Sequence, residues 1–151
     1  MTPADGDVYR KYADELIRFA TTLVGPSAAE DVFSSAMIRA MRAAAWADLD
    51  DPRPYLYRSV ANAAIDLSRR DRRRIWREQR SAVPEVVPSD ELASDVIDAM
   101  RGLTIRQRSI THLAFWHDMT VREISETMRL SVRTTERELS TAKRRLQEML
   151  R

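Results

Sequence analysis

The sequence of 151 residues contains no cysteine, only three glycines and no long apolar run. Without cysteine, the chain cannot form disulfide bonds, thiolate metal sites or thiol redox centres. No apolar stretch approaches the roughly 20 residues of a membrane span, and the acidic N-terminus is unlike the basic, apolar leader of a signal peptide. The scarcity of glycine favours helices over a turn-rich β fold. We therefore expect an all-α, cytoplasmic protein with no membrane insertion.

The chain also lacks the motifs of catalysis and of cofactor binding. It has no phosphate-binding glycine loop and no nucleophile paired with a base in a recognisable motif. His112 and His117 are five residues apart, which places them away from one another around a helix, unlike the i, i+4 pair of a metal site. We interpret both as ordinary helix-surface or boundary residues. The sequence therefore predicts no catalytic residue, no metal site, no cofactor and no enzymatic activity.

Charge is concentrated in two adjacent blocks of opposite sign. Seven arginines and two acids lie between Arg69 and Arg80, which gives a local charge of +5 in a chain whose total is +2. The next block, residues 81–98, holds five acids and no base. A local excess of arginine is typical of a surface that binds a polyanion. The general preference for arginine over lysine, 23 to 2, is explained at least as well by a GC-rich genome.

Apolar residues at three- to four-residue spacing predict two helices at the start of the chain. The first runs over residues 8–23 and is stopped by Gly25 and the proline that follows. The second begins at Ser27, because Ser27 and Glu30 have the spacing of a capping box, and it ends near Trp46.

A third helix and a linker are predicted in the middle of the chain. Asp51 has the chemistry of an N-cap and Pro52 suits the first helical position, so the helix starts there and continues into the arginine block. Pro84 and Pro88 then mark an extended linker over residues 81–89. The first three helices thus form one unit, and a second unit begins after the linker.

The second unit is predicted to contain four helices. Its first helix stops at Gly102, and Thr-x-x-Gln at 104–107 and Thr-x-x-Glu at 120–123 are capping boxes that open the next two. A long last helix starts at Val132. The segment 120–146 reads as a helix-turn-helix, in which the second helix enters the major groove of DNA. Two amphipathic helices that merely pack in a bundle remain the alternative.

These motifs together resemble the extracytoplasmic-function group of bacterial RNA polymerase sigma factors. SAAEDVFSSAMIRAMRA at Ser27–Ala43 and RPYLYRSVANAAIDLSRR at Arg53–Arg70 are similar to sigma region 2. LTIRQRSITHLAFWHDMTVREISETMRLSVRTTERELSTAKRRL at Leu103–Leu146 is similar to sigma region 4. The resemblance runs from about Val8 to Leu150, and the order and spacing of the motifs are more specific than either motif alone.

The resemblance implies a fold, a domain division and a function. The fold is all-α, with a three-helix region 2 at residues 1–80, a linker at 81–89 and a four-helix region 4 with a helix-turn-helix at 90–151. The function is that of an alternative sigma factor, which binds core RNA polymerase, directs it to specific promoters and assists promoter melting. The implied partners are the clamp coiled coil and flap of the polymerase core, promoter DNA as duplex and as non-template single strand, and an anti-sigma factor as a further candidate.

The resemblance assigns core-polymerase binding to the second helix. The implied contacts are Glu30, Asp31, Met37, Ile38, Arg39 and Arg42. An apolar centre with a charged rim is the usual composition of such an interface. Two alternatives stay open, namely that Glu30 caps its own helix and that the methionines belong to the core. The family's common Gln-Glu-Thr-like triplet is replaced here by Ser34, Ser35 and Ala36, which predicts weaker core affinity.

The third helix is implied to read the −10 promoter element and to capture bases of the melted strand. The implied contacts are Asp50, Tyr55, Tyr57, Arg58, Asn62, Arg69, Arg70, Arg73 and Arg74. Tyrosines stack on bases, asparagine bonds base edges, and arginines follow phosphates. The alternative for Tyr55 is core packing, and for the arginines it is a solvated helix end.

The last helix is implied to read the −35 element in the major groove. The implied contacts are Arg133, Thr134, Thr135, Arg137, Glu138, Thr141, Arg144 and Arg145. Glu136 and Glu138 stand where the family usually has basic or small polar residues, and an acid that faces phosphate is repelled. Arg129 replaces a common turn glycine, which is unfavourable if the residue is left-handed. We therefore expect an unusual or weak −35 preference.

Two other functions are compatible with these patterns. The acids of the last helix suit a sigma-like decoy that sequesters an anti-sigma partner and binds no DNA. The helix-turn-helix alone suits a stand-alone transcription regulator that binds duplex DNA without polymerase. The promoter sequence, the regulon and the inducing signal are not encoded in any recognisable motif of the chain.

Overall fold

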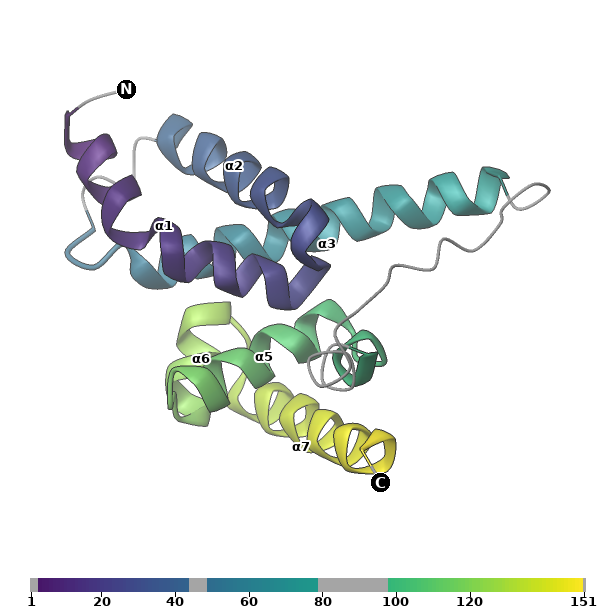
Figure 1. Ribbon diagram of the computed structural model, residues 1–151. Coiled ribbons are helices and arrows are strands. Elements are labelled where there is room, and N and C mark those ends of the chain that lie inside the picture. The colour runs from purple at the N-terminus through teal and green to yellow at the C-terminus, as the bar shows by residue number, and fades with distance from the viewer. Residues whose placement is uncertain (1–2, 44–48, 79–97, 151) are drawn as a thin grey trace.

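The computed structural model describes residues 3–43, 49–78 and 98–150, with side chains over 6–43, 49–74 and 98–150. Within these residues the protein is all-α, and no helix is long and apolar enough to cross a membrane. The helices, shown in Figure 1, are α1 (Pro3–Val24), α2 (Pro26–Arg42), α3 (Arg53–Glu78), α5 (Ile105–Trp116), α6 (Val121–Met128) and α7 (Val132–Met149). A further helical segment at 98–101 precedes α5.

The first unit consists of α1, α2 and α3, each of which packs against the other two. Its apolar stripes meet in a common core that includes Leu16 and Phe19 of α1, Phe33 of α2, and Leu56 and Val60 of α3. The C-terminal part of α3 extends beyond α1 and α2 (Figure 1). The arginines of the block whose side chains the structure describes, residues 69–74, are exposed on this part of the helix.

A single residue connects α1 to α2. Gly25 adopts φ 85°, in the left-handed region that favours glycine, and its amide donates to the Thr21 carbonyl at 2.8 Å. Pro26 starts α2, and no side chain caps this helix. The predicted capping box of Ser27 and Glu30 is therefore wrong, because Pro26 already begins the helix and places Ser27 inside it.

The boundaries of α3 and of the linker agree only in part with the sequence-based expectation. The helix starts at Arg53, one residue later than predicted, and the Asp51 carboxylate accepts a hydrogen bond from the Arg53 amide at 3.1 Å. Helix α2 ends at Arg42, before the predicted end near Trp46, because Ala43 is already extended. The predicted linker at 81–89 lies outside the described residues. The domain bounds at 1–80, 81–89 and 90–151 therefore stay predictions.

Helices α5, α6 and α7 of the second unit start where the sequence predicts. Thr104 and Gln107 form a reciprocal capping box at α5, and Thr120 and Glu123 form another at α6. Ser131 caps α7 by accepting from the Thr134 amide at 3.0 Å, a contact that we did not anticipate. Each capped start satisfies backbone N–H groups that have no partner within their own helix.

The turn between α6 and α7 contains a left-handed residue, the case that the sequence left open for Arg129. Arg129 has φ 53° and ψ 47° at the end of α6, and the following amide, that of Leu130, donates to the Ser125 carbonyl at 2.9 Å. A left-handed non-glycine residue costs about 1–2 kcal/mol. The helix-turn-helix accommodates this cost, and α7 starts at Val132 as predicted.

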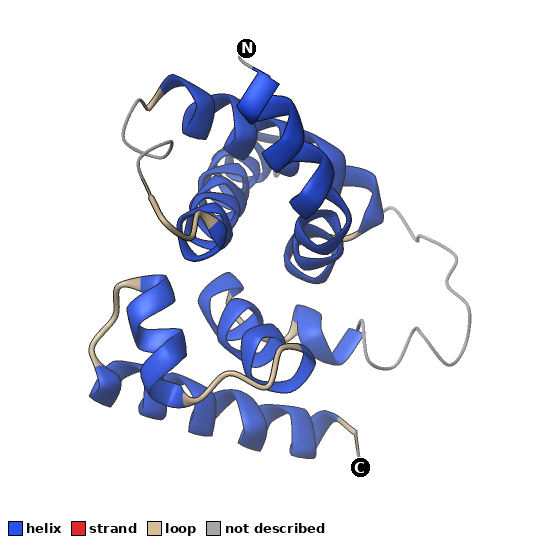
Figure 2. Ribbon diagram, turned by 90° about the vertical axis from the view of Figure 1, so that its left-hand side faces the viewer, coloured by secondary structure: helices blue, strands red, loops and turns tan. Residues whose placement is uncertain are grey.

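The two units pack against each other along α1 and α3 on one side and α5 and α6 on the other (Figure 2). One apolar cluster contains Phe19 and Tyr57 of the first unit together with Ile110, Leu113 and Ile124 of the second. The Phe19 ring meets the Tyr57 ring edge-on, with centroids 4.8 Å apart. The largest core of the protein therefore spans both units.

Arg108 of α5 joins backbone segments from both units. Its Nε donates to the Met100 carbonyl at 2.7 Å and to the Leu103 carbonyl at 3.1 Å. Its Nη2 donates to the Arg101 carbonyl at 3.1 Å, and its Nη1 donates to the Leu23 carbonyl at the end of α1. Carbonyls at helix ends lack intrahelical partners, so one side chain satisfies the ends of two helices.

Candidate nucleic-acid and polymerase interfaces

The C-terminal half of α3 presents a basic, solvent-exposed surface. Near the middle of the helix, apolar residues such as Leu56 and Val60 face the core, whereas Asn62, two residues after Val60, is exposed. The arginines of the block whose side chains are described are all exposed as well, namely Arg69, Arg70, Arg72, Arg73 and Arg74. Guanidinium groups in this arrangement are free to contact successive phosphates.

The N-terminal half of α3 forms a small groove with the preceding loop. Tyr55 is half-buried, and the Arg58 guanidinium lies 5.4 Å from the centroid of its ring. Burial and the nearby charge of Arg129 lower the pKa of Arg58. The groove has a volume of about 250 Å³ and is lined by Leu49, Asp51, Pro54, Tyr55, Arg58 and Arg129. Asp50 is exposed beside it.

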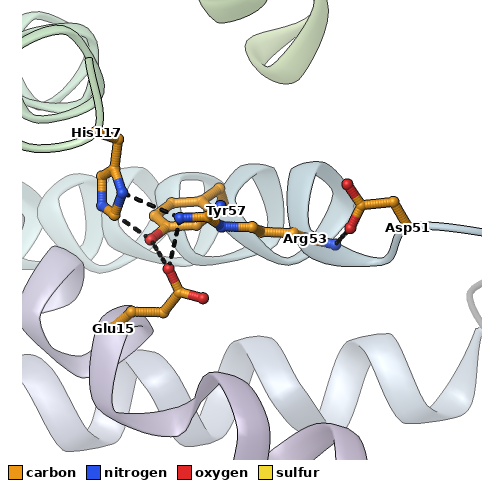
Figure 3. A network of polar contacts seen from close by, with 5 residues as sticks. All are labelled: Glu15, Asp51, Arg53, Tyr57 and His117. Carbon is orange, nitrogen blue, oxygen red and sulfur yellow. Dashed lines mark hydrogen bonds and ion pairs between the residues drawn. The ribbon is translucent and has the colours of Figure 1, made fainter. Parts of the chain in front are cut away.

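Tyr57 lies in the interface between the two units and not on an open surface. Its side chain is fully buried, and its hydroxyl donates to Glu15 Oε2 at 2.8 Å and contacts His117 Nε2 at 3.0 Å (Figure 3). Arg53 Nη2 donates to Glu15 Oε2 at 2.9 Å. Burial, followed by the Glu15 contact, raises the pKa of Tyr57. In this arrangement Tyr57 cannot stack on a base, in contrast to the sequence-based expectation.

The two histidines are neighbours, which corrects the expectation that they point apart. Helix α5 ends at Trp116, so His117 leaves the helical path and its ring centroid lies 5.3 Å from that of His112. His112 is 4% exposed, and its Nδ1 lies 3.0 Å from Thr22 Oγ1. Among the described residues no cluster of three or more acid, histidine or cysteine ligands could hold a metal ion.

These contacts between the two units have almost no signal in the sequence. Glu15 is a polar residue inside the apolar stripe of α1, between Tyr12 and Leu16, and this was the only available signal. Nothing in the local pattern of His117 or Arg53 indicates that the two residues meet across 64 positions of sequence.

Helix α7 exposes most of its predicted DNA contacts. Arg133, Arg137, Arg144 and Arg145 are exposed, and Thr134, Glu138 and Thr141 are half-buried. Thr135 is fully buried, and its hydroxyl donates to the Ser131 carbonyl at 2.9 Å. This corrects the expectation for Thr135, because a core side chain cannot reach a base edge. Arg145 also donates to Gln107 Oε1 at 3.1 Å.

The two acids of α7 occupy different environments. Glu136 is exposed, whereas Glu138 borders a cleft of about 350 Å³ that the two units share. The cleft is lined by Ile65, Ser68, Arg69, Arg72, Thr104, Ile105, Arg106 and Glu138. Glu138 therefore shares this cleft with arginines of α3, and its charge is placed among cations of the same molecule.

Helix α2 offers a mixed apolar and charged surface. Ile38 is 51% exposed, and Glu30, Asp31, Arg39 and Arg42 are exposed around it. Arg39 also forms an ion pair with Asp66 of α3 at 2.9 Å. Because α2 has no side-chain cap, Glu30 does not cap its helix. The remaining predicted contact, Met37, is 3% exposed and belongs to the core. Its prediction as a polymerase contact is therefore wrong.

Comparisons with known proteins agree with this architecture. The family model of Sigma-70 region 2 matches residues 8–74, and the model of Sigma-70, region 4 matches residues 94–146, so that together they cover well over half of the chain. The chain belongs to the extracytoplasmic-function group of sigma factors. It is an alternative sigma factor that acts in transcription initiation, with core RNA polymerase and promoter DNA as its partners. This family consists of transcription regulators and not of enzymes.

A solved structure of another sigma factor shows the same fold. The structure of the sigma factor RpoE in complex with the anti-sigma factor NepR from Bartonella quintana has a TM-score of 0.74 and 19% sequence identity, and the match covers 95% of this sigma factor and 96% of that chain. No curated protein matches the sequence.

Proposed function

We propose that the exposed side of α3 binds the −10 element of promoters. Asn62 is the candidate for reading a base, and Arg69, Arg70, Arg73 and Arg74 are the candidates for following phosphates. The observation that carries this proposal is the exposure of all five side chains along one helix, whose C-terminal part extends beyond α1 and α2 (Figure 1). Arginine contacts to phosphate position DNA, whereas bonds to base edges specify its sequence. The groove at Tyr55 and Arg58, beside Asp50, is the adjoining site for an extruded base.

The same proposal assigns α7 to the −35 element and α2 to the polymerase core. On α7 the proposed contacts are Arg133, Thr134, Arg137, Glu138, Thr141, Arg144 and Arg145. On α2 they are Glu30, Asp31, Ile38, Arg39 and Arg42, with Ile38 as the apolar centre. The clamp coiled coil of the core is the proposed target of α2, and the flap that of the second unit. The boundaries 1–80, 81–89 and 90–151 belong to this proposal.

The location and the chemistry of the protein are part of the proposal as well. A sigma factor works where RNA polymerase and DNA are, so we place it in the cytoplasm. We also propose that the chain itself catalyses no reaction and that RNA synthesis belongs to the core enzyme. Its likeness in fold to a sigma factor solved with an anti-sigma factor supports a partner of that class for this chain too.

Run-off transcription with purified core polymerase and a promoter library tests the proposal. We expect transcripts from a subset of promoters. Asn62→Ala should reduce opening of particular −10 sequences without weakening core binding, and Gln147→Ala, an exposed amide near the end of α7, is the matched control. No transcript from any promoter, with the protein folded and bound to core, contradicts the proposal. Pull-down from cell extract separates the decoy alternative, since a decoy brings an anti-sigma factor without polymerase subunits.

A further inference from the structure

Four side chains form a polar network where the two units meet. Glu15 comes from α1, Arg53 and Tyr57 from α3, and His117 follows α5 of the second unit (Figure 3). His117 contacts Tyr57 through Nε2 at 3.0 Å and Arg53 Nη2 through Nδ1 at 3.1 Å. Glu15 Oε2 accepts hydrogen bonds from the Tyr57 hydroxyl at 2.8 Å and from Arg53 Nη2 at 2.9 Å. The imidazole is thus the group through which the second unit joins the network.

The hydrogen bonds determine the protonation state of His117. Tyr57 has one hydroxyl hydrogen and donates it to Glu15, so its oxygen can only accept from His117 Nε2. Arg53 has only donors, so His117 Nδ1 must accept from it. The network is therefore complete only with a neutral imidazole that carries its hydrogen on Nε2. A second hydrogen on Nδ1 would point at the Arg53 guanidinium.

The network lies over the N-terminal half of α3. Tyr57 is fully buried beneath it, and one turn of α6 covers the neighbouring position, where Arg58 Nη1 donates to the Thr127 carbonyl at 3.5 Å. Arg129 of the second unit lines the groove next to Tyr55. The second unit thus occupies the side of α3 that adjoins the proposed base-binding groove.

We propose that Glu15, Arg53, Tyr57 and His117 form a latch that holds the two units closed over the N-terminal half of α3, and that protonation of His117 opens it. The functional meaning of the latch rests on the proposed role of α3 in promoter binding. The closed state leaves Arg53 Nε buried without a hydrogen-bond partner among the described residues. An unsatisfied buried donor is costly, and opening returns this donor to water, which is one contribution in favour of the open state.

The direction of the pH response follows from the groups that surround each histidine. His117 faces Glu15 of α1, Arg53 and Tyr57 of α3, and His112 of α5. Burial and Arg53 lower its pKa, against the opposing effect of Glu15. His112 faces His117 and packs on Phe19, and burial followed by His117 lowers its pKa to about 4.

Both histidines therefore favour the closed state in their neutral form. The closed state is fully favoured above the ordinary histidine pKa of about 6.5 and loses that advantage as the pH falls toward the lowered values. Each histidine changes the ratio of closed to open molecules by up to about tenfold per pH unit in this window. Because protonation of either histidine favours the open state, the ratio of closed to open molecules changes more steeply with pH than it would with one histidine.

Energy transfer between the two units in the full-length protein tests the latch. The chain has no cysteine, so Ser34→Cys on α2 and Gln147→Cys on α7, both exposed positions, provide unique labelling sites. We expect high transfer at pH 8 and a loss of transfer as the pH falls below about 6.5, with the helical circular dichroism signal unchanged. Transfer that is independent of pH, or that falls only together with helicity, contradicts the proposal.

Variants of the network distinguish opening of the latch from a general loss of structure in acid. His117→Gln keeps an N–H donor and an acceptor but does not titrate. This variant should stay closed, with the loss of transfer at low pH reduced to the part that His112 contributes. Tyr57→Phe keeps the ring and loses the hydroxyl, so it should lower transfer at pH 8. Tyr9→Phe, which removes a hydroxyl from a 42% exposed tyrosine of the same unit, is the matched control. An unchanged response in His117→Gln, or equal transfer in the two tyrosine variants, overturns the latch.

Transcription distinguishes a failure of the latch from a failure of the proposed function. Glu15→Gln lies outside the proposed DNA and polymerase contacts and weakens the acceptor of the network. If the latch exists, this variant opens at pH 8 and binds promoter DNA several-fold more tightly than the parent. If it binds like the parent, the latch does not control α3. If the parent fails in run-off transcription while energy transfer responds to pH, the latch stands and the proposed promoter function fails.

Discussion

The helices α3 and α7 are both proposed to bind promoter DNA, but they differ in how much of their surface the rest of the protein covers. The N-terminal half of α3 is enclosed between α1, α2 and the second unit, and only its C-terminal half presents arginines to solvent. Helix α7 packs one face on α5 and α6 and keeps its other face open along its length. DNA binding by α3 therefore depends on the arrangement of the two units, whereas DNA binding by α7 depends on its own mixed charge.

Removal of a side chain from the shared core should have the largest effect, and it tests whether the two units depend on each other. Phe19 is fully buried and contacts Tyr57 of α3 and His112 of α5, with centroids 4.8 Å and 5.1 Å away. Phe19→Ala should lower the free energy of unfolding by about 3–5 kcal/mol and shift one common transition in a denaturant titration. Phe115→Ala, at a 54% exposed ring, should change it by less than about 0.5 kcal/mol. Two separate transitions would show that the units fold independently.

The arginines of α3 should contribute most of the salt dependence of DNA binding. Replacing Arg69, Arg70 and Arg73 with alanine should reduce the slope of log affinity against log salt by up to about three. Fluorescence anisotropy of promoter DNA with the polymerase holoenzyme measures the slope. The matched control replaces three exposed cations of α1, namely Arg10, Lys11 and Arg18. An equal change in both triple variants would mean that net charge alone matters.

The acids of α7 should weaken duplex binding. Glu136→Gln with Glu138→Gln removes two negative charges, and one unit charge at about 4 Å in water is worth about 1 kcal/mol. Binding of the −35 duplex should therefore become several-fold tighter in an anisotropy titration. Glu148→Gln, at the exposed end of α7, is the control and should leave affinity unchanged. Weaker binding in the double variant would indicate that an acid accepts a hydrogen bond from cytosine.

The left-handed turn of the second unit should give the smallest effect. Arg129 has φ 53° and lies near Arg58, whose pKa is lowered by burial and, to a smaller extent, by the like charge of Arg129. Arg129→Gly should raise stability by about 1 kcal/mol, seen as a rise of about 2–4 °C in the melting temperature. Arg122→Gly, within helix α6, should lower stability by a similar amount. A decrease in both variants would mean that Arg129 makes favourable contacts that outweigh the strain.

The helices were predictable from the sequence wherever the signal is local. The boxes at Thr104 and Thr120 involve atoms three residues apart, so their spacing alone predicts the helix start. The same rule failed at Ser27, because the preceding proline starts the helix earlier. In each case the outcome depended only on neighbouring residues.

The surfaces were less predictable, because burial depends on contacts between distant segments. The sequence predicted exposed arginines on α3, and those whose side chains the structure describes are exposed. It also predicted Tyr57 and Thr135 as DNA contacts, and both are fully buried. Residue chemistry suggested their roles, but only packing determines whether their side chains are accessible. The meeting of Glu15 with His117 through Tyr57 could not have been inferred from either local segment.

The Arg108 contact has a thermodynamic consequence for α2. The Leu23 carbonyl, near the end of α1, accepts a hydrogen bond from Arg108 of the second unit, and two residues later Gly25 turns the chain into α2. The corner that sets the direction of α2 is therefore completed only when the two units are in contact. By linkage, a ligand that binds this corner more tightly in its completed form also draws the units together, and separation of the units weakens that ligand by the same factor.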